Sequence, residues 1–502
     1  MNSDIKLFGF DGLEDVKRTL DADREIRFIR FMTADMNGER PCGFTIPVSE
    51  LGGRREKDGT VSFSGVDPSF EIYKGFDASS LYPERINESD KNAWLDFSTA
   101  RVIPWYYQTH VPGFERRWKE IAVFGDIIDP KNGPYKFDSR NILKRVLAKV
   151  REAGIADTIY IGPEVEFFLF KSDEMGGPLL EEFCLDDCVY NRPVPVDKGR
   201  YFKGGKYGEI RKEAQILLQE MGYRFEYDHH EVSDSQHEVD VHYMEALEMA
   251  DFVMHFRYVI KKVAASYGLF ASFMPKPIAG INGNGMHTHQ SLFKDGKNVF
   301  YDPDDEHHLS VECKRYISGL MKYVPEICAV LNPWVNSFKR LVPGYEAPAY
   351  ICCDVQNRSS LIRIPGYEMN NPDAIRIELR NPDPSSNPYL SFALQIWAGI
   401  RGIVEGLEPP MIRDINVFEL SEEEMDSMGI QRLPPEFGAA LDLMEASALV
   451  KEVMGQDFLS HYLTAKRAHL EGYKTSLGHR KDDISMRVQV SKYEMDELLP
   501  IL

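Results

Sequence analysis

The chain has 502 residues, about three times the usual size of one domain, so we expect two or three domains with a large buried core. Hydrophobic residues make up 43% and charged residues 27%, which excludes a disordered or fibrous chain. Acidic side chains outnumber basic ones by 79 to 59. The resulting net charge of −20 argues against binding to nucleic acid.

Membrane and secretion signals are not expected. The sequence has no run of about 18 apolar residues that would span a membrane. Its first twenty residues lack an apolar stretch behind a basic one, so no secretory signal is predicted. The seven cysteines are few and odd in number, and neither the pair Cys184 and Cys188 nor the pair Cys352 and Cys353 has the second pair of a zinc site. We therefore predict reduced thiols in a cytoplasmic protein.

The N-terminal part predicts one short helix and then a β-rich region. Three apolar residues at helical spacing predict the helix: Leu13, Val16 and Leu20. From residue 25 onward, short β-type runs alternate with turn residues. The turn formers of residues 129–134 predict a boundary. We therefore expect an N-terminal domain over residues 25–130 and a second domain over residues 135–502.

The second part mixes helical and strand patterns, which predicts an α+β domain. Residues 171–208 are rich in Gly, Pro and Asp and predict a long excursion, which is often functional in a compact domain. Around it we expect helices and strands in the following order: a helix over 141–153, a strand over 158–170, a helix over 209–221, a strand over 236–243 and a helix over 244–267.

Acidic residues lie on the predicted strands beside apolar side chains. Glu164 and Glu166 are two residues apart and so project from one face, which continues with Phe168 and Phe170. The segments 236–242 and 375–380 repeat this polar alternation. A solvated face with charge pairs would explain any one of these strands. Three of them, with Glu231 nearby, favour a cation site, because acids beside aromatic residues are costly unless a cation neutralises them.

Many carboxylates with few histidines favour magnesium or manganese over zinc. The sequence has neither a Walker-type phosphate loop nor a dinucleotide fingerprint, so metals and arginines would have to hold any nucleotide phosphates. Five arginines fall close together and could do this, although surface ion pairing is the alternative: Arg340, Arg358, Arg363, Arg376 and Arg380.

The glycine-rich segment 282–287 could approach a small ligand closely, or could be a turn with one packed histidine. Acids, arginines and glycines together predict metal-assisted phosphoryl chemistry on a small anionic substrate.

Long motifs in this chain resemble those of one family, the type I glutamine synthetases of bacteria and archaea. The motifs are GPEVEFFLF (162–170), HHEV with QHEVD (229–240), NGNGMHTHQSL (282–292), NPWVNSFKRLVPGYEAP (332–348), NRSSLIRIP (357–365) and RIELRNPDPSSNPYL (376–390). In the N-terminal part FDASS (76–80) and INESD (86–90) also match. The resemblance therefore covers the chain from about residue 25 to its end.

The resemblance implies an α+β fold in which an N-terminal β-grasp domain precedes a catalytic domain. The catalytic domain would be an open β-barrel, the bifunnel, surrounded by helices, with ATP at one end and glutamate at the other. The resemblance also implies a dodecamer of two hexameric rings, in which the N-terminal domain of one chain completes the site of its neighbour. The apolar end of residues 493–502 would then dock into the opposite ring. A small regulatory protein is a possible partner.

The resemblance assigns the metal and substrate positions residue by residue. One divalent cation would be held by Glu166, Glu231 and Glu238. A second, on the ATP phosphates, would be held by Glu164, His287 and Glu378. Glutamate would be bound by Asn282, Gly283, Arg340 and Arg380. ATP would be bound by Glu226, His289, Ser291, Arg363 and Arg376.

The remaining positions concern phosphoryl transfer, ammonium and control. Arg358 would stabilise the phosphoryl group in transfer, and Glu346 matches the glutamate of the family's mobile flap. Asp77 and Asp90 match the acids that bind and deprotonate ammonium. Arg85 resembles the arginine through which a feedback-inhibited subgroup responds to glutamine.

The implied activity is that of a glutamate–ammonia ligase, which uses ATP and two or more Mg²⁺ or Mn²⁺ ions to make glutamine through γ-glutamyl phosphate. One alternative is a paralogue that joins glutamate to a polyamine or another amine, but the combination of Asp77, Asp90 and Glu346 favours ammonium. The other alternative is a non-catalytic scaffold. Retention of all six metal-ligand positions argues against it, because unused buried acids would reduce stability.

Overall fold

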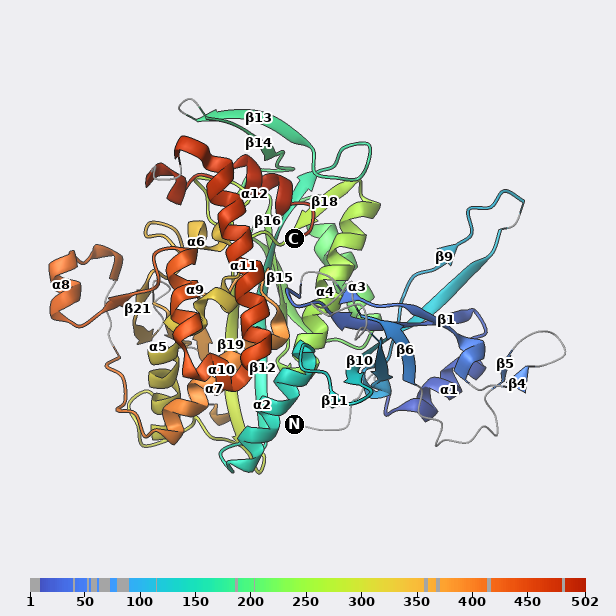
Figure 1. Cartoon of the computed structure of the whole chain (residues 1–502), viewed down its shortest axis with the longest axis horizontal. Coiled ribbons are helices and arrows are strands. Elements are labelled where there is room, and N and C mark those ends of the chain that lie inside the picture. Colours follow the sequence, from blue (N-terminus) through green and yellow to red (C-terminus); the bar gives the residue numbers. More distant parts are fainter. Residues whose placement is uncertain are drawn as a thin grey trace.

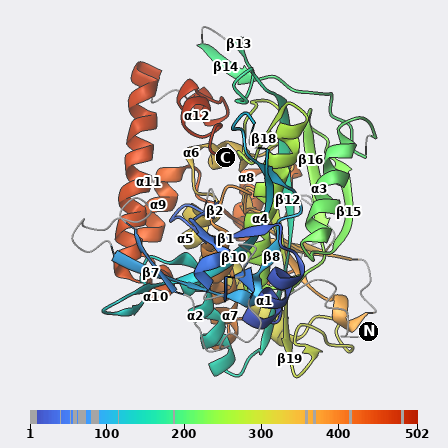
Figure 2. The ribbon, with the colours of Figure 1, turned by 90° about the vertical axis from the view of Figure 1, so that its right-hand side faces the viewer.

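The computed structural model describes residues 10–38, 41–51, 54–55, 61–62, 73–78, 90–113, 115–185, 188–202, 204–355, 360–366, 371–412, 417–480 and 484–502. Within these ranges the chain has two large sheets and a set of helices, most of which lie in the main body, and this confirms the predicted α+β class (Figure 1). The smaller, N-terminal sheet projects to the right of the main body in Figure 1 and faces the viewer in Figure 2. No described helix combines the length and the apolar character needed to cross a bilayer.

The N-terminal sheet is built around two long strands, β1 (Ile26–Ala34) and β10 (Arg117–Asp129), which run parallel. Its main path has the order β2-β1-β10-β7-β6. The helix that precedes it is α1 (Leu13–Ala22), as predicted. The other strands of this part are β2 (Pro41–Cys42), β3 (Thr45–Pro47), β4 (Arg54–Arg55), β5 (Val61–Ser62), β6 (Tyr73–Asp77), β7 (Asp90–Leu95), β8 (Arg101–Val102), β9 (Tyr107–Gln108) and β11 (Gly133–Pro134).

The second sheet has the order β15-β16-β12-β19-β24-β23-β22, with antiparallel pairing along this path except between β22 and β23. Its strands are β12 (Thr158–Lys171), β15 (Phe225–His230), β16 (Gln236–Val241), β17 (Met244–Glu245), β18 (Leu269–Ser272), β19 (Met286–Lys294), β20 (Lys297–Asn298), β22 (Cys353–Val355), β23 (Ile362–Ile364) and β24 (Ile377–Leu379). A separate pair joins β21 (Tyr350–Ile351) to β25 (Gln431–Arg432).

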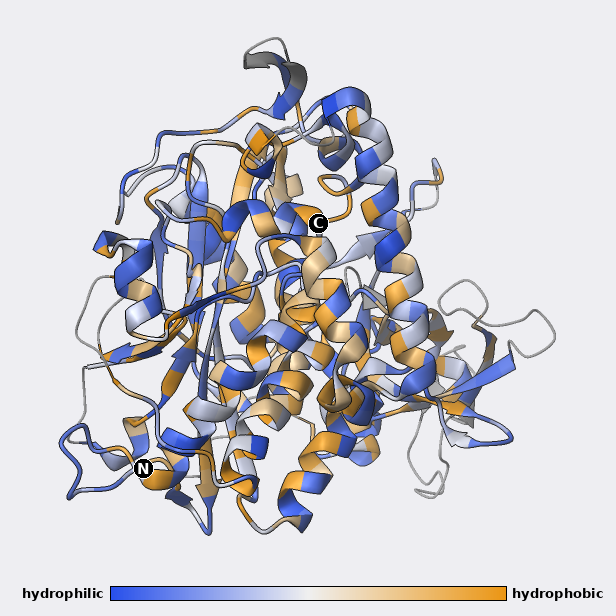
Figure 3. Cartoon of the chain, turned by 60° about the vertical axis from the view of Figure 1, so that its left-hand side comes forward, coloured by the Kyte–Doolittle hydropathy of each residue, from blue (hydrophilic) through white to orange (hydrophobic). Residues whose placement is uncertain are grey.

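Some helices of the main body pack on this sheet, and others pack on one another. The helices are α2 (Ser139–Glu152), α3 (Gly208–Glu220), α4 (Ala246–Ser266), α5 (Val311–Leu331), α6 (Val335–Arg340), α7 (Pro388–Val404), α8 (Glu422–Ser427), α9 (Phe437–Ala446), α10 (Ala448–Met454), α11 (Gln456–Leu477) and α12 (Lys492–Glu497). Helix α4 packs on β12 and β18, while α5 packs on α7 and α9. Hydrophobic residues are dense on the central helices and sparse at the periphery (Figure 3).

Local sequence explains where the helices begin. Asp138 caps α2 by accepting a hydrogen bond from the backbone N–H of Arg140 at 2.9 Å. Asn387 caps α7 in the same way, and Pro388 occupies its first position, where a missing N–H has no cost. Most residues of α7 are buried, since it lies between α5 and α2, and this explains its nearly continuous apolar sequence.

The structure adds detail to one expectation and corrects another. The predicted excursion over residues 171–208 contains a regular hairpin of β13 (Leu180–Leu185) and β14 (Cys188–Pro193), which projects from the top of the molecule in Figure 1. The C-terminal segment packs on its own chain rather than leaving apolar side chains for another ring. Leu498, Leu499 and Leu502 are buried with Phe168 and Phe170 of β12, so their apolar character is explained within one chain.

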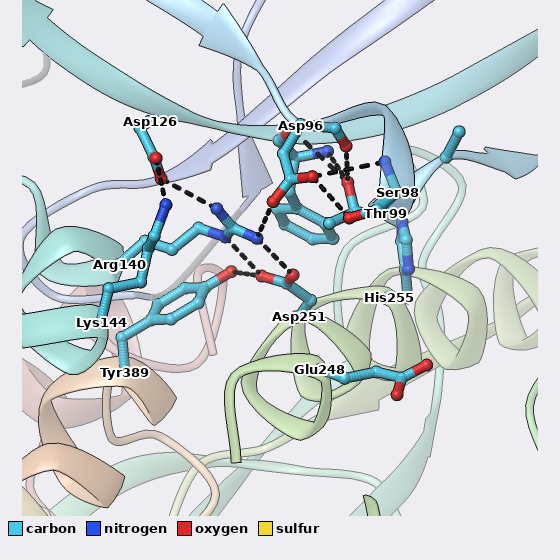
Figure 4. Close-up of polar contacts among 12 residues, drawn as sticks. Asp96, Ser98, Thr99, Asp126, Arg140, Lys144, Glu248, Asp251, His255 and Tyr389 are labelled. Carbon is cyan, nitrogen blue, oxygen red and sulfur yellow. Dashed lines mark hydrogen bonds and ion pairs between the residues drawn. The ribbon is translucent and has the colours of Figure 1, made fainter. Parts of the chain in front are cut away.

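One buried arginine joins the N-terminal sheet to the helices of the main body (Figure 4). The guanidinium of Arg140 donates to Asp126 at 2.8 Å, to Asp96 at 3.0 Å and to both oxygens of Asp251 at 3.1 Å. Tyr389 of α7 donates to the same Asp251 at 2.6 Å. Burial raises the pKa of Asp251, while Arg140 and Tyr389 oppose that rise by favouring the carboxylate. The network therefore depends on Arg140 retaining its fork geometry.

We expect Arg140→Met to lower the free energy of unfolding by about 3 kcal/mol or more, because it leaves a buried carboxylate without its partner. The measurement is urea unfolding followed by circular dichroism. Arg467 is the matched control, because its guanidinium also bridges two carboxylates, those of Asp442 and Glu445, but at the surface. Arg467→Met should cost less than about 1 kcal/mol. Equal losses in the two variants would show that the Arg140 network has no special role.

Candidate active site

Strand register brings the predicted acids together on one face of the second sheet. Glu164 of β12 is paired with Asp240 of β16 on one side and with His287 of β19 on the other. Two residues along β12, Glu166 is paired with Glu238. Because the side-chain period of a strand is two, this register places all five side chains on the same face. The sequence predicted this shared face, and the structure confirms it.

Among the described residues, four groups of ligand-type side chains lie close enough to hold a cation, and three of them contain predicted metal ligands. In each group the potential ligand atoms are within 4.8 Å of one another. These three are Glu164 with His287 and Glu378, His229 with Glu231 and Glu238, and Glu164 with Glu238 and Asp240. The first is the set that the resemblance implies for a cation on ATP. The second contains two of the three residues implied for the other cation, with His229 in addition.

Hydrogen bonds orient the first group. The Nδ1 of His287 and the Nε2 of His289 donate to the two carboxylate oxygens of Glu164, each at 2.9 Å. The other ring nitrogen of His287, Nε2, is buried and has no hydrogen-bond partner among the described residues. Burial and the nearby Arg380 lower the pKa of His287 to about 4, so the ring is neutral near pH 7. A neutral imidazole among carboxylates is a donor set that suits a divalent cation.

Glu378 is different, because two arginines neutralise it. Its side chain is completely buried, and Arg380 and Arg363 donate to its two oxygens, each at 2.5 Å. Burial alone would raise the pKa of Glu378, but Arg380 and Arg363 outweigh burial and hold the pKa below its ordinary value. The two guanidinium groups are thereby fixed at the site, and both also line the cavity described next.

The acids and arginines surround one cavity of about 220 Å³. Twelve of the predicted site residues line it: Glu164, Glu166, Glu226, Glu231, Glu238, Asn282, Gly283, His287, Arg340, Glu346, Arg363 and Arg380. Arg340 is almost completely buried, and its guanidinium donates to the backbone carbonyls of Asn381 at 2.8 Å and Arg380 at 3.2 Å. Acids and cations therefore line the same cavity, as binding of an anion beside a metal requires.

Burial and crowding of like charges raise the pKa values of two acids in this cavity, Glu166 and Glu238. Burial raises the pKa of Glu166 well above its ordinary value, and the neighbouring Glu231 adds to the rise. Burial also raises the pKa of Glu238 well above its ordinary value, with Asp240 and Glu164 contributing. A bound divalent cation would relieve this repulsion, so the residues present fit a metal centre.

A fourth group, Asp197 with His230 and His237, is a support rather than a cation site. A guanidinium can only donate, so the contact of 2.5 Å from Arg211 to Nδ1 of His237 means that this nitrogen accepts. The ring proton is then on Nε2, which leaves His237 no free lone pair for a metal. Arg211 also donates to Asp228 at 2.5 Å. Through these two contacts Arg211 links helix α3 to strands β15 and β16.

Several predicted residues lie next to the cavity without lining it. Glu378 is itself a member of the first group, His289 donates to Glu164 of that group, and Arg376 donates to Nδ1 of His289 at 3.3 Å. Ser291 is buried farther along β19. Glu226 lines the cavity but is exposed, and its carboxylate lies 3.5 Å from Nδ1 of His242.

Asp77 and Asp90 are brought together with each other but not with this cavity. They are directly opposite across β6 and β7, and both are exposed. Neither is among the residues that line the cavity. Arg358 and Arg85 lie outside the described residues.

Sequence reasoning missed several residues that shape the site. The amide of Gln236 donates to Glu166 at 2.6 Å and to the carbonyl of Gly283 at 3.1 Å, which ties the acid strand to the glycine loop. His229 lies 3.3 Å from Glu231 and 3.4 Å from Glu238. Gln236 and Asp240 lie in the alternating segment 236–242, and His229 lies in the motif over 229–240. None of the three was predicted as a site residue. Tyr201, Tyr227 and Tyr345 also line the cavity; of these, Tyr345 alone lies in a quoted motif, that of residues 332–348.

Comparison with known proteins gives one consistent result. Residues 136–482 match the family described as "Glutamine synthetase, catalytic domain". The chain is 42% identical to the glutamine synthetase of Methanosarcina mazei over 92% of this chain and 94% of that protein. It is 39% identical to that of Mycolicibacterium smegmatis over 92% and 96%.

Two solved structures have a similar fold. One is the glutamine synthetase of Plasmodium falciparum, with a TM-score of 0.75 at 23% identity, covering 96% of this chain and 100% of the other. The second is a complex of GmaS with ADP, with a TM-score of 0.75 at 25% identity, covering 97% and 100%.

We expect Glu238→Gln to stabilise the metal-free protein and to weaken the stabilisation by metal, because the crowded acids cause both effects. The folded state raises the pKa of Glu238, so the ionised form is disfavoured in the folded protein. The free energy of unfolding therefore falls as the pH rises above the pKa of an ordinary glutamate. A neutral amide avoids this loss, so in EDTA at pH 7 the variant should melt at a higher temperature than the wild type. It should also lose most of the rise in melting temperature that Mg²⁺ or Mn²⁺ gives the wild type.

The control for this prediction is Glu220→Gln, which changes an exposed acid at the end of α3. It should leave both melting temperatures unchanged. A Glu238→Gln protein that is destabilised in EDTA, or that keeps the full metal-dependent rise, would contradict the interpretation of this face as a metal centre.

Proposed function

The chain belongs to the glutamine synthetase family, and we propose that its cavity carries out the glutamate–ammonia ligase reaction with ATP as co-substrate. The observation that carries the proposal is the convergence of buried acids and fixed arginines on one cavity. The acids suit divalent cations, and the arginines suit a carboxylate or a phosphoryl group.

We propose that the metals are two or more Mg²⁺ or Mn²⁺ ions, held by Glu164, His287 and Glu378 and by Glu166, Glu231 and Glu238. When bound, these ions would neutralise the phosphate oxygens and the crowded carboxylates. Oxygen-rich donor sets with one imidazole support this choice over zinc.

The chain's own residues would orient the two reacting groups. Asn282, Gly283, Arg340 and Arg380 would hold glutamate so that its γ-carboxylate attacks the terminal phosphate of ATP. Arg363, Arg376, His289, Ser291 and Glu226 would hold ATP, and Arg358 would stabilise the phosphoryl group in transfer. The product of this step is γ-glutamyl phosphate with ADP as leaving group, so positioning and charge stabilisation account for most of the catalysis. The GmaS neighbour, solved with ADP, is consistent with nucleotide binding by this fold.

In the second step ammonia attacks the acyl carbon, and phosphate leaves. Asp77 and Asp90 would attract ammonium and take its proton, because a carboxylate near 4 Å from an ammonium ion contributes roughly 4 kcal/mol at intermediate dielectric. Glu346 would close over the intermediate and exclude water. Arg85 would make the enzyme responsive to glutamine.

We also propose a domain division and an assembly. The N-terminal domain would cover residues 25–130 and the catalytic domain residues 135–502, which is supported by two sheets that share no strand. Since the exposed pair Asp77 and Asp90 does not line the cavity of its own chain, we propose that it completes the cavity of a neighbouring chain within a dodecamer of two hexameric rings. Four buried free thiols support a cytoplasmic location: Cys313, Cys328, Cys352 and Cys353.

We expect the wild type to release phosphate from ATP with glutamate and ammonium, and to do so far more slowly with putrescine or methylamine. Asp77→Ala should lower kcat/KM for ammonium at least about tenfold, which corresponds to about 1.4 kcal/mol, while KM for glutamate changes little. Glu115→Ala, which removes another exposed acid of the N-terminal part, is the control and should have no effect. Equal rates with ammonium and putrescine would instead favour the polyamine paralogue.

Complementation tests whether two chains share one site. Asp77→Ala and Glu378→Ala should each be nearly inactive alone. When they are co-expressed and assemble together, some interfaces pair an intact Asp77 with an intact Glu378, and we expect activity to return to an appreciable fraction of the wild-type value. Mixed oligomers as inactive as their parents would show that each site belongs to a single chain.

A further inference from the structure

Two segments meet at the wall of the cavity, residues 281–283 and residues 344–347. Asn282 and Gly283 of the first segment, and Tyr345 and Glu346 of the second, line the cavity. The direct hydrogen bond between them runs from the amide of Asn282 to Glu346 at 3.3 Å, which is long for such a bond. A further contact is therefore needed to explain how the two segments are held.

Lys276 provides that contact from behind the wall. Its side chain is almost completely buried, and its ammonium group donates to the backbone carbonyl of Ile281. The same ammonium group lies 3.6 Å from the centre of the Tyr345 ring, well within the range of a cation–π interaction. The end of one side chain thus contacts both segments.

Burial disfavours the charged form of Lys276, and the contacts of its ammonium group oppose this effect. Burial and the Arg340 guanidinium lower the pKa of Lys276 to about 7. The Ile281 carbonyl and the Tyr345 ring are the groups that favour its charged form. A lysine with an exposed alternative would be expected to turn toward water instead.

The backbone of Lys276 is fixed by the helix that carries Arg340. Asn336 of α6 accepts from the N–H of Lys276 at 2.7 Å and donates to its carbonyl at 3.0 Å. Asn336 in turn donates to the buried Glu494 of α12 at 2.9 Å. The lysine therefore extends from a rigid support toward the more exposed turn that carries Glu346.

The glycine loop is fitted closely to this lysine. A Cβ on Gly283 would lie 2.2 Å from the carbonyl of Pro275 and 3.2 Å from Cδ of Lys276. The N–H of Asn284 donates to the same Pro275 carbonyl at 2.8 Å. Displacing Lys276 would thus disturb both sides of the wall.

We propose that Lys276 is a positioning residue that holds the Tyr345–Glu346 turn against the Asn282–Gly283 loop and so keeps water away from the acyl phosphate. This inference rests on the proposed function. When the wall is loosened, water rather than ammonia attacks the acyl carbon, the bond from that carbon to the phosphate oxygen breaks, and glutamate and phosphate are released with no C–N bond formed.

The experiment measures phosphate released per glutamine formed by the assembled enzyme, with ATP, Mg²⁺, glutamate and ammonium present. The wild type should release the two products in nearly equal amounts. Lys276→Met should raise the ratio at least about threefold, because hydrolysis then competes with amination. Lys276→Arg, which keeps a cation beside the ring, should restore the ratio at least in part.

Lys261→Met is the matched control. The ammonium group of Lys261 also donates to a backbone carbonyl, that of Ile501 at 2.8 Å, and lies 5.9 Å from the centre of an aromatic ring, that of Phe273. It does not line the cavity. Its loss should affect stability and leave the ratio unchanged.

Tyr345 provides a second test that does not depend on folding of the Lys276 variants, since it is only half-buried. Tyr345→Leu should raise the ratio, and Tyr345→Phe should not, because phenylalanine keeps the ring face. Unchanged ratios in Lys276→Met and Tyr345→Leu, or an equal rise in Lys261→Met, would overturn the inference alone. A wild type that makes no glutamine would overturn the proposed function and this inference with it.

Discussion

The buried carboxylates of the second sheet are the constraint on which the rest of the structure depends. Ionised acids in a low-dielectric environment repel one another, so this face is unfavourable unless the backbone holds it rigidly and a cation completes it. Cross-strand register provides the rigidity, since Glu164 and Glu166 each have a fixed partner on β16. The arginines that neutralise Glu378 lie beside them, whereas burial and neighbouring acids raise the pKa values of Glu166, Glu231, Glu238 and Asp240 and so disfavour their ionised forms.

Rigidity of this kind requires support from distant parts of the chain. Lys339 and Glu494 form a buried ion pair that fastens α6, and hence Arg340, to α12. The C-terminal leucines fill the far end of the acid face by packing on Phe168 and Phe170. The end of the chain is therefore part of the active-site scaffold, which explains why an apolar tail is retained even though it is buried within one chain.

The sequence predicts most of the regular elements and the acid face, because both follow from residue spacing. A period of two on β12 and β16 is enough to put Glu164, Glu166 and Glu238 on one side. The sequence could not predict which residues of different strands face each other. Pairing of Glu164 with His287, or the bond from Gln236 to Glu166, depends on strand order and register. The hairpin of β13 and β14 was missed because Gly and Pro around it obscure a short alternation, and the C-terminal tail was misassigned because burial within one chain and burial between chains require the same apolar residues.

Gly285 is under a steric constraint that residue spacing in the sequence does not reveal. A Cβ on Gly285 would lie 2.6 Å from Nη2 of Arg340, 2.8 Å from Nε2 of His287 and 3.2 Å from Oε1 of Glu166. A guanidinium, an imidazole and a carboxylate thus converge on a point that only a residue without a side chain can occupy. A side chain there would displace Arg340, His287 or Glu166. Gly285 therefore allows Arg340, which we propose binds the substrate anion, to lie close to His287 and Glu166, which we propose bind cations.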